Sequence, residues 1–596
     1  MIPGHRELAS REAAQFKGLL RFFEHRQYKR GLKSAEQILK KSPEHGETLA
    51  MKGLFLSNLD RKEEGYECVR KGLKNDLTSH ICWHVYGLLY RADKEYEEAT
   101  KCYRNALKFD KNNMQILRDL ALLQIQMRNY EGYAETRDLL LQLNSHNRMF
   151  WIGFAIAFQL NGDHDLAIRV LKTYEDSMKI APPKGDYEHS ELLLYRNTLY
   201  EESGDLEGAL ADLDAIEDRV CDPISVLEKR GNLLQKLGQL GKAKATYRRL
   251  IDENPECRDY LVGYFACFGF PADVTEDARS KQIVEECALL ADHHSRANLL
   301  RRFPLDYLHG DAFRTRASAY VRTMLRKGVP SLFVNLKPLY ADSERAAIIE
   351  DIMLAQQKSL KENSTLVGED IKEPPTTYLW TQYYLAQHYD RKGDIECALA
   401  LVNETIAHTP TLVELYMTKA RILKHAGDLD GAAEVMNEAR QLDLQDRCVI
   451  SKCTKYLIRS NRIEEAEKTI GLFTRPDIKD PIKDLIDMQC LWFAKETAHG
   501  YIRQNKIGRA LKRLHQIEKH FDDFTDDQFD FHTYCLRKTT LRSYIRLLKF
   551  EDTLYTHPTF VDAAESAIKV THPGLRCLFD VMFGANDMVT VLSGLV

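Results

Sequence analysis

Several features are missing from this 596-residue chain, and each absence excludes a class of protein. No apolar run approaches the roughly 20 residues that a membrane span needs, and the first residues, MIPGHRELASREAAQF, lack the hydrophobic core of a secretory signal. The net charge is only −4, from 84 basic and 88 acidic residues. We therefore expect no membrane association and no sequence-specific nucleic-acid binding.

The cysteines and histidines lack the spacing of disulfide or metal sites. Thirteen cysteines form an odd set without a C-x-x-C pair, which favours reduced thiols in the core of a cytosolic protein. The pair His293–His294 is the strongest metal candidate. Neighbouring residues of a helix diverge by about 100°, however, so they do not face one ligand. We predict no metal site.

Catalytic motifs are missing as well. The chain has no Walker loop, no H-E-x-x-H, no G-x-S-x-G and no Rossmann glycine set. The nearest approaches to the acetyl-CoA cradle Q/R-x-x-G-x-G/A are QKLGQL at 235–240 and QLNGDH at 159–164, and each lacks the small final residue. We predict no catalytic residues, and an enzyme in its own right is the least favoured hypothesis.

What the chain does contain is a repeat of 34 residues. It is clearest in CWHVYGLLYRADKEYEEATKCYRNALKFD, at 82–110, where aromatic and small residues occupy the packing positions of a tetratricopeptide repeat (TPR), a pair of antiparallel helices. Small residues recur at position 20, where the two helices cross. They are Gly31, Gly65, Ala99, Ala167, Ala209, Ala243, Ala398, Ala432 and Ala466, with Tyr133 as an interruption.

The turn between the two helices gives an independent signal. Position 15 carries Gly or Asn in seven units, and these residues accept the left-handed conformation that ends a helix. They are Gly162, Gly204, Gly238, Gly393, Gly427, Asn461 and Asn505. The predicted fold class is therefore all-α, a TPR superhelical solenoid with a long concave surface.

The repeat register divides the chain into five parts. A first TPR block of about seven repeats spans 12–255, and a second block spans 378–525. Between them, 256–372 keeps a helical pattern broken by prolines, and KENSTLVGEDIKEPPTT at 361–377 is typical of a surface loop. C-terminal helices are expected at 526–570, followed by a divergent, apolar tail at 571–596.

One group of cations stands out in the second block. Positions 9, 12 and 13 of the first helix of a repeat face the groove, so five side chains should converge there. They are Arg421, Lys424, His425, Lys455 and Arg459. Converging cations suit an anion, either an acidic surface of a partner or a small polyphosphate. The alternative is a solvated face whose cations pair with nearby Glu and Asp.

Several segments go beyond the generic repeat. Among them are HGETLAMKG (45–53), EPPTTYLWTQYYLAQHYD (373–390), TPTLVELYMTKARILKHAGD (409–428) and DDQFDFHTYCLRKTTLRSYIRLLKFED (526–552). From about residue 12 to about residue 570, the chain resembles the large auxiliary subunit of the N-terminal acetyltransferase A (NatA) complex. The sequence after that point departs from the family, as in a shortened form.

The resemblance implies a non-catalytic scaffold that binds and conformationally activates a GNAT-fold catalytic subunit. It also implies a position at the ribosome for co-translational N-terminal acetylation, a second N-terminal acetyltransferase subunit as a further partner, and a cytoplasmic location with the nucleus left open. No cofactor for catalysis is expected in this chain. The alternative is a general TPR scaffold of another multiprotein complex.

Inositol hexakisphosphate, held at the interface of the two subunits, is a further implication of the resemblance. The basic helices at 419–425 and 447–455 match the region concerned. The expected ligand set is Lys419, Arg421, Lys424, His425, Arg447, Lys452 and Lys455, with Lys419, Lys424, Arg447 and Lys452 as first choices.

Overall fold

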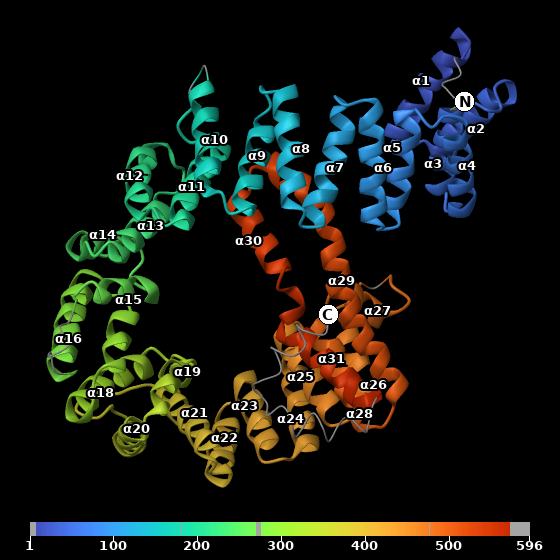
Figure 1. The fold of residues 1–596 in the computed structure, drawn as a ribbon. Coiled ribbons are helices and arrows are strands. Elements are labelled where there is room, and N and C mark those ends of the chain that lie inside the picture. Colours follow the sequence, from blue (N-terminus) through green and yellow to red (C-terminus); the bar gives the residue numbers. More distant parts are fainter. Residues whose placement is uncertain (1–7, 179, 181, 270–275, 476, 572–596) are drawn as a thin grey trace. The chain divides into compact units, whose positions relative to one another are not determined.

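The computed structural model describes residues 8–178, 180, 182–269, 276–475 and 477–571 (Figure 1). The ordered elements in these residues are helices, and one isolated bridge between extended residues joins Thr365 to Lys372. The all-α TPR solenoid that the repeat predicts is confirmed. Among the described residues, no helix combines the length and apolar character that crossing a bilayer requires.

The chain forms two compact units. Unit 1 consists of Met1–Val226 together with Thr525–Glu551, and unit 2 consists of Leu227–Phe524 together with Asp552–Val596. This division differs from the five predicted parts, because residues 525–551 belong with the N-terminal repeats and not with the residues on either side of them.

Antiparallel helix pairs make up most of unit 1 (Figure 1). The first helices of the pairs are α1 (Ser10–Glu24), α3 (Gly46–Ser57), α5 (His80–Ala92), α7 (Met114–Gln126), α9 (Arg148–Leu160) and α11 (Tyr187–Ser203). The second helices are α2 (Tyr28–Lys41), α4 (Lys62–Asn75), α6 (Tyr96–Phe109), α8 (Tyr130–Leu143), α10 (His164–Ser177) and α12 (Leu206–Ile216), which continues into η1 (Glu217–Arg219).

Small residues let the helices of a repeat approach each other closely. A Cβ atom added to Gly53 of α3 would lie 2.5 Å from the carbonyl oxygen of Gly65 in α4, and one added to Gly65 would lie 2.8 Å from that of Gly53. In the next repeat, the Tyr103 ring packs directly on Gly87, where a Cβ would be 2.4 Å from a ring carbon. The aromatic and small residues of 82–110 are therefore packing residues.

The left-handed turn at position 15 extends beyond the glycines. All seven predicted residues have positive φ, from 57° at Asn505 to 90° at Gly393. The same conformation recurs, with φ between 55° and 65°, at Arg26, Asp60, Lys94 and Arg128, which precede Gly162 in successive steps of 34 residues. The backbone repeat therefore continues where the residue type no longer signals it.

Residues 525–551 form a helical hairpin in unit 1. It consists of the end of α29 (Ile507–Lys538) and of α30 (Leu541–Glu551), and α30 lies against α11. Leu536, Tyr544 and Leu548 are buried in one cluster with apolar residues of α7–α11. Because this apolar face is covered by the repeats, the hairpin belongs to the core of unit 1.

A buried histidine lies where this hairpin meets the repeats. Nδ1 of His532 lies 2.8 Å from the Tyr544 hydroxyl, and Nε2 lies 2.7 Å from Oε1 of Gln126. Since a carboxamide oxygen only accepts, Nε2 carries the proton and Nδ1 accepts from the tyrosine. Burial, with smaller contributions from the charges of Arg128 and Arg137, lowers the pKa of His532 to about 3. The ring is therefore neutral at physiological pH.

Ion pairs surround this apolar contact. The Arg542 guanidinium donates to one Glu191 oxygen from Nε at 3.1 Å and from Nη2 at 2.8 Å, and its backbone N–H donates to the other at 3.0 Å. Further pairs are Arg128–Glu551 at 2.8 Å, Lys549–Glu202 at 2.8 Å and Lys94–Asp526.

Unit 2 begins with an irregular helical segment. After α13 (Pro223–Lys236), which the two units share, and α14 (Leu240–Glu253) come α15 (Arg258–Ala266), α16 (Glu276–His293), α17 (Leu299–Arg302), η2 (Phe303–Asp306), α18 (Gly310–Arg326), α19 (Leu332–Leu336), η3 (Lys337–Ala341) and α20 (Ser343–Asn363). The loop predicted at 361–377 is shorter, because α20 continues to Asn363 and the next helix begins at Pro375. Nε2 of His294, one of the two adjacent histidines that we considered as a metal site, lies 2.9 Å from Oδ1 of Asp252.

The second repeat block follows. Its helices are α21 (Pro375–Lys392), α22 (Ile395–His408), α23 (Val413–His425), α24 (Leu429–Leu442), α25 (Arg447–Arg459), α26 (Ile463–Gly471), α27 (Pro481–Asp487) and α28 (Leu491–Arg503). Beyond the hairpin, η4 (Leu554–Thr556) leads to α31 (Pro558–Thr571), which packs against α28.

Candidate anion-binding surface

The cations of the second block lie on α23 and α25, which are the first helices of consecutive repeats. The periodic apolar residues of α23, among them Leu415 and Ile422, are buried against the neighbouring helices. Lys419 and Lys424, on the same helix, are half-buried. At the start of α25, the Asp446 carboxylate accepts from the backbone N–H groups of the first turn, which fixes the beginning of this helix.

Two of the predicted cations meet a carboxylate of α21. Nε of Arg421 lies 3.3 Å from Oδ2 of Asp390, and Nδ1 of His425 lies 2.7 Å from Oδ1. Arg421 also donates from Nη2 to the Gln387 carboxamide at 3.2 Å. The Asp390 side chain is only 5% exposed, so its carboxylate is shielded from solvent and interacts mainly with these two residues.

Two further cations meet a carboxylate of α28. The Arg459 guanidinium donates to both oxygens of Glu496, at 2.7 Å and 3.2 Å, and Nζ of Lys455 lies 3.5 Å from one of them. Burial alone would raise the pKa of Glu496, but the hydrogen bond and charge of Arg459 outweigh it and hold that pKa below its usual value. Arg459 and Lys455 are thus neutralised locally.

Lys424 lies between these two clusters. Burial, then the positive charges of Arg459 and Arg421, lower the pKa of its ammonium group, and Asp390 offsets this only in part. Among the described residues, no carboxylate forms an ion pair with Lys424. Lys424 thus feels the charges of both clusters and has no carboxylate partner of its own among the described residues.

Three other predicted ligands also lack a carboxylate partner within the described part of the chain. Nζ of Lys452 lies 3.8 Å from Sδ of Met417, and Cζ of Arg447 lies 5.3 Å from the centre of the Phe473 ring. Lys419 is half-buried on α23. We call Lys419, Lys424, Arg447 and Lys452 the open cations. The salt-paired alternative describes Arg421, His425, Lys455 and Arg459, but not these four.

The sequence did not reveal the residues that separate the salt-paired cations from the open cations. Asp390 and Gln387 lie on α21, and Glu496 lies on α28, outside the two helices considered. A signal existed for Asp390: it precedes Gly393 by three residues, as Lys424 precedes Gly427, so the repeat register places both on the same face of adjacent first helices.

Comparison with known proteins identifies the family. The family model described as "N-terminal acetyltransferase A, auxiliary subunit" matches residues 187–572. The chain belongs to the NatA auxiliary subunit family. A second model, that of the N-terminal TPR repeats region of psidin, matches residues 15–251. The open cations lie within the part that matches the NatA auxiliary subunit model.

Two curated NatA auxiliary subunits show the extent of the likeness. The NatA complex auxiliary subunit NAA15 of Arabidopsis thaliana is 46% identical over 567 residues, which cover 94% of this chain and 63% of the relative. Human N-alpha-acetyltransferase 16, NatA auxiliary subunit, is 47% identical over 573 residues, with 94% and 65% covered. The chain thus spans somewhat less than two thirds of these relatives.

A solved structure extends the comparison to three dimensions. A chain from the structure of Naa15/Naa10 bound to HypK-THB matches with a TM-score of 0.86 and 41% sequence identity. The match covers 98% of this chain and 86% of that one. The arrangement of helices described above is therefore shared with that chain.

Proposed function

We propose that this chain acts as the non-catalytic auxiliary subunit of a NatA complex and binds a GNAT-fold catalytic subunit. The supporting observation is its likeness, at a TM-score of 0.86, to a chain from the structure of Naa15/Naa10 bound to HypK-THB. Because the two chains share 41% sequence identity over nearly the whole of this one, the surfaces that hold a partner should correspond as well.

The auxiliary subunit would act through conformation. By holding helices and loops of the catalytic partner in a productive arrangement, it shifts the partner's population toward the active state and contributes no catalytic group of its own. On the same family ground, the proposal includes a cytoplasmic location, positioning at the ribosome and contact with a second N-terminal acetyltransferase subunit.

Purification of the tagged chain from its own cells, followed by mass spectrometry, tests this proposal. We expect a GNAT-fold protein in stoichiometric amount, and acetyl transfer to a peptide that begins with Ser only when that protein is present. A general scaffold would instead bring down a different complex without an acetyltransferase. That outcome, or acetyl-CoA turnover by the isolated chain, would overturn the proposal.

Inositol hexakisphosphate is the ligand that we propose for the open cations. The support is their lack of carboxylate partners and the lowered pKa of Lys424, since a bound polyphosphate would relieve the repulsion from Arg459 and Arg421. The neighbouring Asp390 and Glu496 would hold the paired cations in place around the ligand.

Thermal unfolding with and without inositol hexakisphosphate tests this site. At a ligand concentration of 100 times Kd, binding adds about 2.7 kcal/mol to the stability of the site, which should raise the Tm by several degrees. The double variant Lys424→Glu/Lys452→Glu should lose this ligand-dependent shift. Lys512→Glu, on the exposed face of α29, removes a surface lysine elsewhere and should keep it. Equal shifts in all three proteins would contradict the site.

A further inference from the structure

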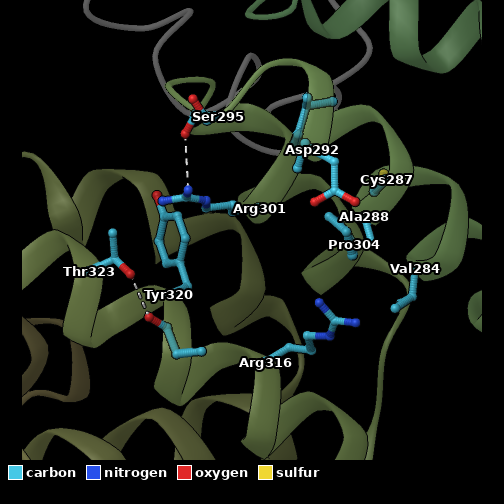
Figure 2. A pocket seen from close by; sticks show the side chains of 13 residues that line it. Val284, Cys287, Ala288, Asp292, Ser295, Arg301, Pro304, Arg316, Tyr320 and Thr323 are labelled. Atoms are coloured by element: carbon cyan, nitrogen blue, oxygen red, sulfur yellow. Dashed lines mark hydrogen bonds between the residues drawn. The ribbon is translucent and has the colours of Figure 1, made fainter. Parts of the chain in front are cut away.

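A second surface of interest lies in the irregular segment of unit 2, outside the open cations. A cleft of about 490 Å³ lies between α16 and α18, with α17 and η2 at one end (Figure 2). This volume falls within the range of about 300–1,000 Å³ that is usual for ligand-binding clefts. We call it the α16–α18 cleft.

The floor of the cleft is apolar and consists of four small side chains and one tyrosine. On α16 it is lined by Cys287, Ala288 and Ala291, which share one helical face, and on α18 by Ala319 and Tyr320. Three alanines leave the space between the helices unfilled. Burial raises the pKa of the Cys287 thiol to about 12, so the floor carries no charge at neutral pH.

Charged side chains surround this floor. Figure 2 shows Arg316 and Asp292 pointing toward the middle of the cleft, and the guanidinium of Arg301 beside the Tyr320 ring, where it points toward Ser295. Arg301 is oriented by a hydrogen bond from Nη2 to the backbone oxygen of Ser295, at 3.0 Å. Nε and Nη1 of the same guanidinium remain available, and the carboxylate of Asp292 forms no ion pair with a described residue.

Arg316 is exceptional on its helix. The other three arginines of α18 have carboxylate partners: Arg314 pairs with Asp351 at 2.9 Å, Arg322 with Glu369 at 3.5 Å, and Arg326 with Glu373 at 2.8 Å. Arg316, which lines the cleft, has no such partner among the described residues. The cleft therefore combines an apolar floor with two uncompensated guanidinium groups.

We propose that the α16–α18 cleft binds an acidic peptide segment of a partner protein. One apolar side chain of the segment occupies the space above Ala288, Ala291 and Ala319. Neighbouring Asp or Glu residues are held by Arg301 and by Arg316, each of whose planar groups matches a carboxylate. Asp292 accepts backbone N–H groups of the segment and repels a second carboxylate on its side, which sets the direction of the peptide.

An exposed leucine lies on α16 beside the face that lines the cleft. Leu289 is 58% exposed, and it precedes Asp292 by three residues on α16, so both lie on one face of the helix. A peptide longer than the cleft would cover this side chain as well. The proposal does not depend on the NatA assignment, because none of these residues belongs to the cationic surface.

Fluorescence anisotropy with the full chain tests this inference. The probe is a panel of fluorescein-labelled peptides, blocked at both ends, that combine one Leu, Met or Phe with two Glu at spacings of up to three residues. A matched panel carries Gln in place of Glu. We expect binders in the first panel and affinities about tenfold weaker in the second, because each lost charge-assisted hydrogen bond costs roughly a factor of ten.

Variants assign the binding to the cleft. Arg301→Ala/Arg316→Ala should weaken binding about tenfold or more, and Ala319→Leu should abolish it by filling the floor. Arg314→Ala, which removes an arginine of the same helix that points to Asp351, should leave it unchanged. The proposal is overturned if no Glu peptide binds, if the Gln panel binds equally well, or if the double arginine variant keeps full affinity. Self-association of the chain that Ala319→Leu abolishes would assign the cleft to a second copy and overturn it too.

Discussion

At the scale of single residues, two glycines set the distance between α3 and α4. Gly53 and Gly65 face each other so closely that a Cβ on either would meet the other's carbonyl oxygen at 2.8 Å or less. Gly46 and Gly72 repeat this reciprocal contact, at 2.8 and 2.7 Å, seven residues away along each helix. Since backbone cannot move aside as a side chain can, these positions tolerate no larger residue without separating the helices.

Substitution of Gly53 by alanine should therefore destabilise unit 1. We expect a loss of about 1–3 kcal/mol from overpacking, seen as a Tm lowered by several degrees. Gly18→Ala is the matched control: Gly18 lies inside α1 with open space around its Cβ position, and alanine there should stabilise the helix by up to about 1 kcal/mol. Similar Tm shifts for the two variants would show that the close contact does not limit the packing.

Sequence reasoning at this scale succeeded where residue type and backbone geometry coincide. Position 15 could be found from Gly162, Gly393 and Asn461 because these residues accept a positive φ at low cost. The same turn at Arg26 or Lys94 could not be found from residue type, since neither is typical of a left-handed position. There, only the 34-residue step reveals the turn.

At the scale of elements, the 525–551 hairpin depends on partners about 400 residues away in the sequence. His532 joins the two parts through Gln126, whose carboxamide donates to the Thr525 carbonyl at 3.2 Å and accepts from the imidazole. The neutral ring lies near the positive charges of Arg128 and Arg137, so protonation would place a third cation in a buried site.

The hairpin should consequently loosen in mild acid. The pKa of His532 is about 3 in the folded protein and about 6.5 when unfolded, so the unfolded state binds the extra proton between these values. The contribution of this residue to stability is complete above pH 6.5 and declines as the pH falls toward 3, by about 2 kcal/mol at pH 5.

Hydrogen exchange of the 525–551 amides, corrected for intrinsic rates, measures this effect. Protection should decrease between pH 7 and pH 5 in the wild-type chain and change less in His532→Gln, which cannot be protonated but keeps an N–H donor for Gln126. An identical decrease in both proteins would exclude His532 as its cause.

The elements themselves could be predicted from the sequence, but several of their contacts could not. The 3.6-residue periodicity marks which face of a helix is apolar, without saying which distant face covers it. Leu536 and Leu548 therefore indicate a buried hairpin and leave its partner undetermined. In the same way, the cations of α23 and α25 could be placed in the groove, whereas their division by Asp390 and Glu496 required neighbouring helices in three dimensions.

At the scale of the whole molecule, the compact units do not follow the order of the chain. Unit 1 is built from two separate segments, 1–226 and 525–551, and the chain crosses between the units three times. A truncation within 525–551 should therefore damage the N-terminal repeats, although it removes none of their residues.

Expression of the two segments as separate polypeptides tests this organisation. Residues 1–226 and 525–551, produced together, should co-purify as a complex with a Kd in the micromolar range or tighter, because the contact buries several large apolar side chains at roughly 1.5–3 kcal/mol each. The double variant Leu541→Asp/Leu548→Asp should abolish co-purification, while Lys538→Asp, at the end of α29, should retain it. If Leu541→Asp/Leu548→Asp retained the complex as Lys538→Asp does, that result would contradict a shared core.

Two of the left-handed residues of unit 1 also contact the 525–551 hairpin. Lys94 and Arg128, which adopt a conformation natural to glycine, carry the side chains that pair with Asp526 and Glu551. Glycine at either position would relax the backbone but remove one ion pair with the hairpin. These two effects on stability oppose each other, whereas at Arg26 and Asp60 only the first applies. A turn residue with a local conformational cost thus also anchors the hairpin, and the glycine that the repeat favours at this position would remove that anchor.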